Sequence, residues 1–159
     1  MNYNSVHYDA TNDMKAVTDA TLIALVRACP NLTRLQLQGT SGLTDDSLLA
    51  IYEHCPKLTA LEVSRASGGK NVFTPRVFTA LTENPTWMPK LKTLSLSSAL
   101  GLYCSNTRKE KNQGEHAMIT MSKARPKLLF ARVSISEEKN WGDWDLVKTY
   151  SKYNNGSRA

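Results

Sequence analysis

Two cysteines at equivalent points of a repeating pattern are the residues of this chain most able to do chemistry. Cys29 and Cys55 each precede a proline and lie 26 residues apart. A thiolate beside an imidazole could act as a nucleophile, and His54 directly precedes Cys55. Adjacent residues at a helix end point in different directions, however, and Ala28 precedes the other cysteine. We therefore predict that both thiols are small, polarisable fillers of the core.

No other catalytic or metal-binding pattern in the sequence is complete. The segment ASGGKNV, residues 66–72, fails as a phosphate loop because Ser64 replaces the first glycine and Asn71 follows the lysine. The three histidines are scattered, and no Cys-x-x-Cys or His-x-x-x-His spacing predicts a zinc site. We expect no catalytic residue, no cofactor and no metal, and we expect Cys104 to be the most exposed thiol.

The sequence pattern that positions these residues occurs more than once along the chain. Residues 17–37 and 43–63 match at nine positions when they are offset by 26. A third copy with insertions follows at residues 73–97, where Met88 takes the place of the cysteine, and a weaker fourth copy covers residues 116–136. Self-similarity at a fixed period is the signature of a repeat architecture.

Each unit of this pattern predicts a helix followed by a short strand. A threonine hydroxyl can cap each of the first three helices, and a proline prevents each helix from continuing. The residues concerned are Thr18, Thr44 and Thr74, and Pro30, Pro56 and Pro85. The pattern Leu-x-x-Leu-x-Leu then predicts a strand whose alternate residues point inward. One helix and one strand cannot bury both apolar faces alone, so we expect a right-handed α/β solenoid with a parallel sheet on its concave side.

The pattern Leu-Thr-Asp-x-x-Leu-x-x-Ile-x-x-x-Cys-Pro-x-Leu-x-x-Leu-x-Val of residues 43–63 resembles the cysteine-containing leucine-rich repeat of F-box/LRR proteins, the ribonuclease-inhibitor-like class, and fungal members above all. The resemblance implies a leucine-rich-repeat solenoid of about four repeats. It also implies substrate recognition for an SCF-type ubiquitin ligase, in which a separate F-box binds a Skp-type adaptor. Residues 1–16 leave no room for an F-box, so that adaptor is an expected partner only if an F-box lies outside this chain.

A protein partner is expected on the outward-facing residues of the concave strands and on the loops that follow them. These positions mix small, polar and charged residues, as a recognition surface can, although ordinary solvent-facing strand residues would look the same. On the strands they are Arg34, Gln36, Gln38, Ala60, Glu62, Ser64, Thr93, Ser95, Ser97, Phe130, Arg132 and Ser134. In the loops they are Arg65, Lys70, Arg108, Lys109 and Lys111.

The charge of the chain is uneven between its two halves. Residues 1–69 carry five basic and seven acidic residues, whereas residues 70–159 carry fifteen and seven, within a net charge of +6. This asymmetry indicates an acidic or phosphorylated protein partner, a nucleic acid, or only a solvated basic surface. Nucleic acid is less favoured because the aromatic residues cluster in the tail instead of interleaving with basic residues on a sheet. A scaffold or regulator unrelated to ubiquitin, such as one acting on a GTPase, is the other alternative.

Three segments outside the regular pattern complete the expected organisation. We expect residues 1–16 to be a polar extension, residues 98–114 a long loop within repeats that span 17–136, and residues 137–159 a C-terminal cap. The cap would cover the last apolar layer, or else present an aromatic docking surface, with Trp141, Trp144, Leu146 and Val147. Because neither a membrane-spanning run nor a secretion signal is visible, we expect a cytoplasmic or nuclear protein with reduced thiols.

Overall fold

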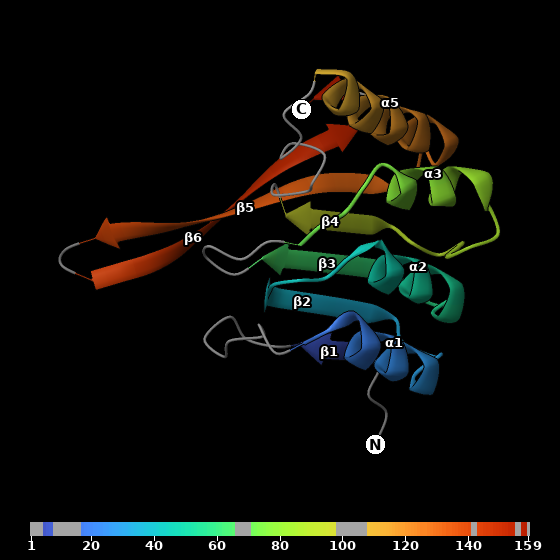
Figure 1. Cartoon of the computed structure of the whole chain (residues 1–159), viewed down its shortest axis with the longest axis horizontal. Helices are drawn as coiled ribbons and strands as arrows, with labels where there is room; N and C mark the ends of the chain where they lie inside the picture. Colours follow the sequence, from blue (N-terminus) through green and yellow to red (C-terminus); the bar gives the residue numbers. More distant parts are fainter. Residues whose placement is uncertain are drawn as a thin grey trace.

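Helices and parallel strands alternate along the chain, and the helices lie on one side of a single sheet (Figure 1). The computed structural model describes residues 5–7, 17–65, 71–97, 108–140, 143–154 and 157–158, with side chains within 17–65, 71–96 and 113–130. The helices are α1 (Asp19–Ala28), α2 (Asp45–His54), α3 (Arg76–Glu83) and α5 (Arg108–Ala124). The strands are β1 (Ser5–His7), β2 (Arg34–Thr40), β3 (Ala60–Arg65), β4 (Thr93–Ser97), β5 (Leu129–Asn140), β6 (Asp143–Asn154) and β7 (Ser157–Arg158).

The strands lie in the sheet in the order in which they follow one another along the chain. Each strand from β1 to β4 is parallel to the next, whereas β6 is antiparallel to β5 and to β7. Leu35 pairs with Leu61, so the sequence offset of 26 is also the register between β2 and β3. The expected α/β class, with a parallel sheet that alternates with helices, is confirmed.

Threonine hydroxyls mark the helix starts, as the sequence predicts. Thr18 Oγ1 accepts a hydrogen bond of 3.3 Å from the N–H of Thr21, and Thr44 Oγ1 accepts one of 3.4 Å from the N–H of Asp46. α3 begins only after Pro75, yet Thr74 Oγ1 still accepts a bond of 3.3 Å from the N–H of Arg76. The first three helices each end two residues before a proline, which cannot supply the N–H that a further turn needs.

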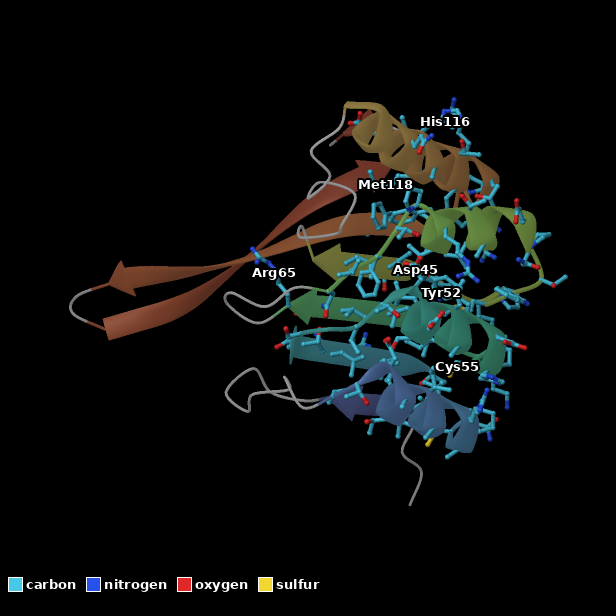
Figure 2. The ribbon with its side chains drawn as sticks, viewed as in Figure 1. Asp45, Tyr52, Cys55, Arg65, His116 and Met118 are labelled. Carbon is cyan, nitrogen blue, oxygen red and sulfur yellow. The ribbon has the colours of Figure 1, made fainter. Side chains whose placement is uncertain are left out.

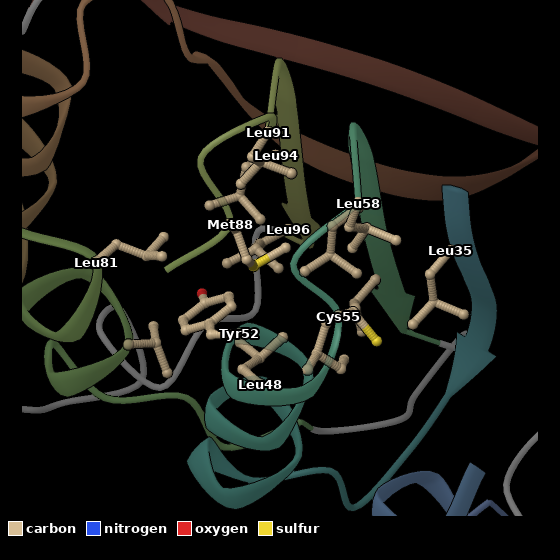
Figure 3. Packing of buried hydrophobic residues seen from close by; sticks show 14 of the residues in the cluster. Leu35, Leu48, Tyr52, Cys55, Leu58, Leu81, Met88, Leu91, Leu94 and Leu96 are labelled. Carbon is tan, nitrogen blue, oxygen red and sulfur yellow. The ribbon is translucent and has the colours of Figure 1, made fainter. Parts of the chain in front are cut away.

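The core fills the space between the sheet and the helices. Leu48 and Tyr52 of α2 lie close to the inward leucines of neighbouring strands (Figure 3). Cys55 and Met88, both fully buried, occupy equivalent corners, because the carbonyl of each accepts a bond from the leucine three residues on, at 3.2 and 3.1 Å. The predicted exchange of cysteine for methionine at this corner is therefore confirmed. Met88 has a positive φ of 48°, and the backbone of the longer link from α3 to β4 turns there.

Carboxylates at the helix starts tie successive units together. Asp19 accepts hydrogen bonds from the N–H and the hydroxyl of Thr44, at 2.9 and 2.7 Å. One unit further on, Asp45 accepts bonds from the N–H, at 2.7 Å, and the hydroxyl of Thr74. Pro75 stands at the corresponding place in the third unit, so the series of carboxylates ends there.

The fourth helix is longer than the sequence suggested. α5 begins at Arg108, so residues 108–114, which we expected in a loop, form its first turns. The segment is rich in Arg, Lys, Glu and Gln, which lose little side-chain freedom in a helix, and this explains the error. Residues 98–107 lie outside the described residues.

The frame of the fourth strand is also different from the expected one. Phe130, predicted to face outward, is fully buried and pairs with the inward Leu94. Only one residue, instead of two, lies between the buried Leu128 and the first inward residue of the strand. Because side chains alternate with a period of two, a shift of one residue exchanges the two faces.

The C-terminal segment forms a long antiparallel ribbon with β5. Residues 143–153 of β6 pair with residues 130–140 of β5 in one unbroken register. The ribbon projects beyond the end of the parallel strands (Figure 1). Capping of the core by this segment stays a prediction, and Trp141 lies outside the described residues.

Candidate protein-binding face

The side of the sheet that faces away from the helices carries a cluster of polar side chains centred on Glu62. The two carboxylate oxygens of Glu62 accept hydrogen bonds from the side-chain N–H groups of Gln36, at 3.0 Å, and Gln38, at 3.4 Å. These bonds hold the carboxylate in one orientation across β2 and β3. We call this surface the open face; its residues are Arg34, Gln36, Gln38, Ala60, Glu62, Thr93 and Ser95.

A shallow pocket of about 200 Å³ lies on the open face. The strand register sets Gln36 beside Glu62 and Glu62 beside Ser95, so the pocket crosses three strands. Small side chains at Ala60, Thr93 and Ser95 leave the space, while longer polar side chains surround it. The pocket can therefore take one side chain of a partner and offer it hydrogen-bonding groups of both kinds.

Ser64 does not belong to the open face, and its placement there was wrong. The residue is fully buried, its carbonyl accepts a bond of 3.0 Å from Thr40 Oγ1, and that hydroxyl accepts one of 2.8 Å from the side chain of Asn71. This buried group lies where the β2–β3 register shifts after Leu37. The irregularity breaks the alternation on which the prediction depended.

The residues predicted on the later strands are only partly placed. Ser97 ends β4 and pairs with Val133, and Arg132 pairs with Leu96, a core residue. The prediction that Arg132 faces outward assumed the same strand frame as the prediction for Phe130, and the buried Phe130 contradicts that frame. The side chains of Ser97 and Arg132 lie outside the described residues.

The loop residues predicted to bind a partner do not form one loop cluster. Arg108, Lys109 and Lys111 stand in the first turns of α5, so their assignment to a loop was wrong. Arg65 lies at the end of β3 that is farther from the helices (Figure 2), and it is half-buried with an interaction partner of its own. Lys70 lies outside the described residues.

Both cysteines of the repeat pack with the core, Cys55 within it and the partly buried Cys29 against it. Cys55 is fully buried, and its Sγ is 3.9 Å from the carbonyl oxygen of Cys29, toward which the S–H donates. Burial, and then the neighbouring thiol, raise the pKa of Cys55 to about 11, which disfavours the reactive thiolate. His54 Nε2 accepts a bond of 3.5 Å from Arg27 Nε, so this imidazole is directed to the neighbouring unit. Cys104 lies outside the described residues.

The described segments contain neither a metal-binding cluster nor a membrane-spanning helix. They hold no group of three or more His, Cys, Asp or Glu side chains that could bind a metal ion. Nor does any helix within them have the length and apolar character that crossing a bilayer requires. A groove of about 820 Å³ does lie between α3 and α5, lined by residues such as Thr79, Glu83, His116 and Thr120.

The tail contradicts one reason for setting nucleic acid aside. We expected its aromatic residues not to interleave with basic ones on a sheet. In β6, however, Trp144, Lys148, Tyr150 and Lys152 occupy even-numbered positions of one strand and therefore share one face of the ribbon. The period of two could have revealed this pattern, but the expectation of an irregular C-terminal cap does not include a strand here.

Arg125 is the most heavily bonded side chain that sequence reasoning missed. Its guanidinium donates to the carbonyls of Leu81 (3.1 Å), Asn84 (3.0 Å), Trp87 (2.7 Å) and Met88 (3.2 Å). It thereby satisfies carbonyls at the end of α3 and in the long link that follows. The only sequence signal is its position one residue before Pro126, where the first two units have cysteine.

Comparison with known proteins adds no functional assignment to this geometry. No protein-family model matches the chain, and no curated protein matches it.

Proposed function

We propose that the fold is a leucine-rich-repeat solenoid of about four units, and that the chain is a non-enzymatic module that holds a protein partner on its open face. The observation that carries this proposal is the pocket across β2, β3 and β4, with the carboxylate of Glu62 oriented by two amide side chains. Preorganised polar groups around a pocket lower the entropy lost on binding and favour a defined partner.

The biological context we propose follows from the sequence resemblance. In F-box/LRR proteins such repeats recognise the substrates of a ubiquitin ligase, and we propose the same role here. A Skp-type adaptor would then be joined through an F-box outside this sequence. The repeated pattern of residues 17–63 supports the proposal, because it matches the repeat of that class nearly throughout.

A pair of charge-matched variants tests the open face. E62R/S95R places two long cations in the pocket, whereas E53R/T79R makes the same change of charge at exposed helix positions. Partners are captured by proximity labelling with the unmodified chain, then purified and titrated calorimetrically against each variant. We expect E62R/S95R to lower the affinity for the tightest-binding partner at least about tenfold, or about 1.4 kcal/mol, and E53R/T79R to leave that affinity unchanged.

Two results would contradict the proposal. Equal affinity of both variants for every purified partner would remove the open face as the binding site. A partner whose cellular half-life is the same with and without this chain would remove the turnover role, while leaving protein binding in place.

A further inference from the structure

The β5–β6 ribbon extends the sheet beyond its parallel strands. β4 pairs with β5 only as far as Val133, whereas the β5–β6 register continues to the Asn140–Asp143 pair. From Ser134 onward, the ribbon therefore consists of two strands within the described part of the chain. A two-stranded antiparallel ribbon is marginally stable in water, and a third strand stabilises it.

One face of this ribbon is continuous with the open face. The register joins Glu62 to Ser95, Ser95 to Ala131 and Ala131 to Lys152, so these four residues form one row across the sheet. Paired residues share a face, and alternate residues along a strand return to it. The ribbon residues on this face are Ala131, Val133, Ile135, Glu137 and Lys139 of β5, and Trp144, Leu146, Lys148, Tyr150 and Lys152 of β6.

The two faces of the ribbon differ in charge and in apolar content. The face continuous with the open face carries three lysines and one glutamate, together with Trp144, Leu146 and Tyr150. The opposite face between residues 131 and 152 carries one basic residue, Arg132, and three acidic ones. This separation follows from the period-two pattern of the sequence, and it gives one face basic and aromatic character.

The outer edge of β6 is open along most of its length in the described structure. β7 pairs only with Tyr153 and Asn154, which leaves residues 143–152 without a described strand on that side. An edge strand presents a row of backbone donors and acceptors that can pair with another extended chain.

We propose that β6 takes an extended segment of a protein partner as an added strand. Acidic residues of that segment would lie beside Lys148 and Lys152, and apolar residues beside Trp144, Leu146 and Tyr150. The inference rests on the proposed function and deepens it, since it names the chemical class of the segment that the same sheet holds.

The spacing and the edge favour a peptide over a nucleic acid. Lys148 and Lys152 are four residues apart, about 13 Å in a strand, which matches the first and third of three side chains on one face of an extended peptide, with an apolar one between them. A peptide also supplies backbone partners to the open edge. A single-stranded nucleic acid could stack on Trp144 and Tyr150, but it would leave that edge unpaired.

A synthetic peptide tests the added strand directly. The probe is a fluorescent peptide of about nine residues, with apolar residues at alternate positions and glutamate at the two positions matched to Lys148 and Lys152. We expect salt-sensitive binding to the full chain, measured by fluorescence anisotropy. K148E/K152E should weaken this binding at least about tenfold and should bind a peptide with lysines at those two positions instead. K123E/K127E, an equal change of charge at exposed residues, should change nothing.

Three outcomes would overturn the inference: no binding of the acidic peptide, equal binding by K148E/K152E, or tighter binding of an oligothymidylate than of the peptide. The last would assign this face to single-stranded nucleic acid. Circular dichroism of each variant checks that the sheet is retained. The E62R/S95R variant separates this test from that of the proposed function, because it should bind the purified partner at least about tenfold more weakly and the peptide unchanged.

Discussion

At the scale of single residues, the carboxylates at the helix starts do more than favour a helical turn. Asp19 accepts bonds from Thr44 and from the hydroxyl of Ser47, both in the next unit, whereas Asp46 is exposed in the first turn of α2. A bond to an ionised group contributes about 1.5–3 kcal/mol, more than the 0.3–1 kcal/mol of a charge at a helix end. Asp19 and its counterpart Asp45 therefore hold units together.

The pH dependence of folding should report the Asp19 contacts. Burial acts to raise the pKa of Asp19, but the hydrogen bonds from Ser47 and Thr44 outweigh it, so the folded pKa lies below the ordinary value of 3.8. The stability that the ionised form contributes is therefore complete above 3.8 and is lost as the pH falls through the lower, folded value. In urea titrations we expect D19N to cost about 1–3 kcal/mol at neutral pH, with the gap to the native chain closing below pH 3.8.

The exposed Asp46 supplies the control for this measurement. D46N removes the same charge from a first turn without breaking a bond between units, so we expect a cost below about 1 kcal/mol. A D19N gap that stays constant under acid conditions would show that the cost lies elsewhere than in the ionised carboxylate.

The role of a residue within one unit could be predicted from the sequence, whereas its contacts with other units could not. The offset of 26 predicted the capping threonines and the buried corner of Cys55, because both depend on position within one unit. It did not predict that Asp19 bonds to Thr44, because that contact depends on how two units are stacked. The hydrogen bonds of Arg125 could not be predicted for the same reason, since its acceptors lie in the preceding unit.

At the scale of the elements, the link from α3 to β4 is the least regular part of the repeat. It contains the positive-φ Met88, and four of its own or adjoining carbonyls are held by Arg125 from the next unit. A planar guanidinium with five N–H donors can serve several acceptors at once, which a single ammonium on a flexible stem cannot do in the same geometry. The link is thus held by an element that follows it in the chain.

Substitution of Arg125 should destabilise this link more than its exposure suggests. R125M removes one hydrogen bond from each of four carbonyls, of which those of Asn84 and Met88 keep a backbone donor, and we expect a loss of about 2–3 kcal/mol in the free energy of unfolding. R125K should recover less than half of it. The control is K127M, an exposed neighbour, which should be close to neutral. A neutral R125M would mean that water replaces the guanidinium at no cost.

The order of the elements could be predicted from sequence, but their exact frame could not. Periods of 3.6 and 2 with threonine and proline punctuation placed α1 to α3 and the strands after them. The fourth strand was misjudged because one missing residue in its link leaves the apolar pattern almost unchanged while it exchanges the faces. The ribbon was missed because lysines share one face of β6 with apolar residues, so the polar–apolar alternation of a half-buried strand is weak there.

At the scale of the whole molecule, stability should be graded along the stack of units. α2 packs between α1 and α3 and contributes six buried residues, whereas α5 packs beside α3 and lies beyond the end of the carboxylate series. In stacked repeats, each unit is stabilised by its neighbours, so a central unit is held from both sides.

Native-state hydrogen exchange should reveal this gradient. We expect amides of α2 and β3 to open at free energies near that of global unfolding, and amides of α5 to exchange at least about tenfold faster. The internal comparison is α1, the outer helix at the other end, which is tied to α2 through Asp19 and should be intermediate. Uniform protection over all helices would show that the chain unfolds as one cooperative unit.

The shortened link before β5 shows how much variation the units of this sheet accept. Units one and two are interchangeable in principle, because the same residue number after the proline leads to the same face of the sheet. The fourth unit reaches β5 one residue early, so Phe130 takes the inward place. The fourth unit nevertheless pairs with β4 in register, so the fold accepts the loss of one residue between the proline and the strand. The distance from proline to strand can therefore vary between units, provided that an apolar residue still reaches the inward position opposite Leu94.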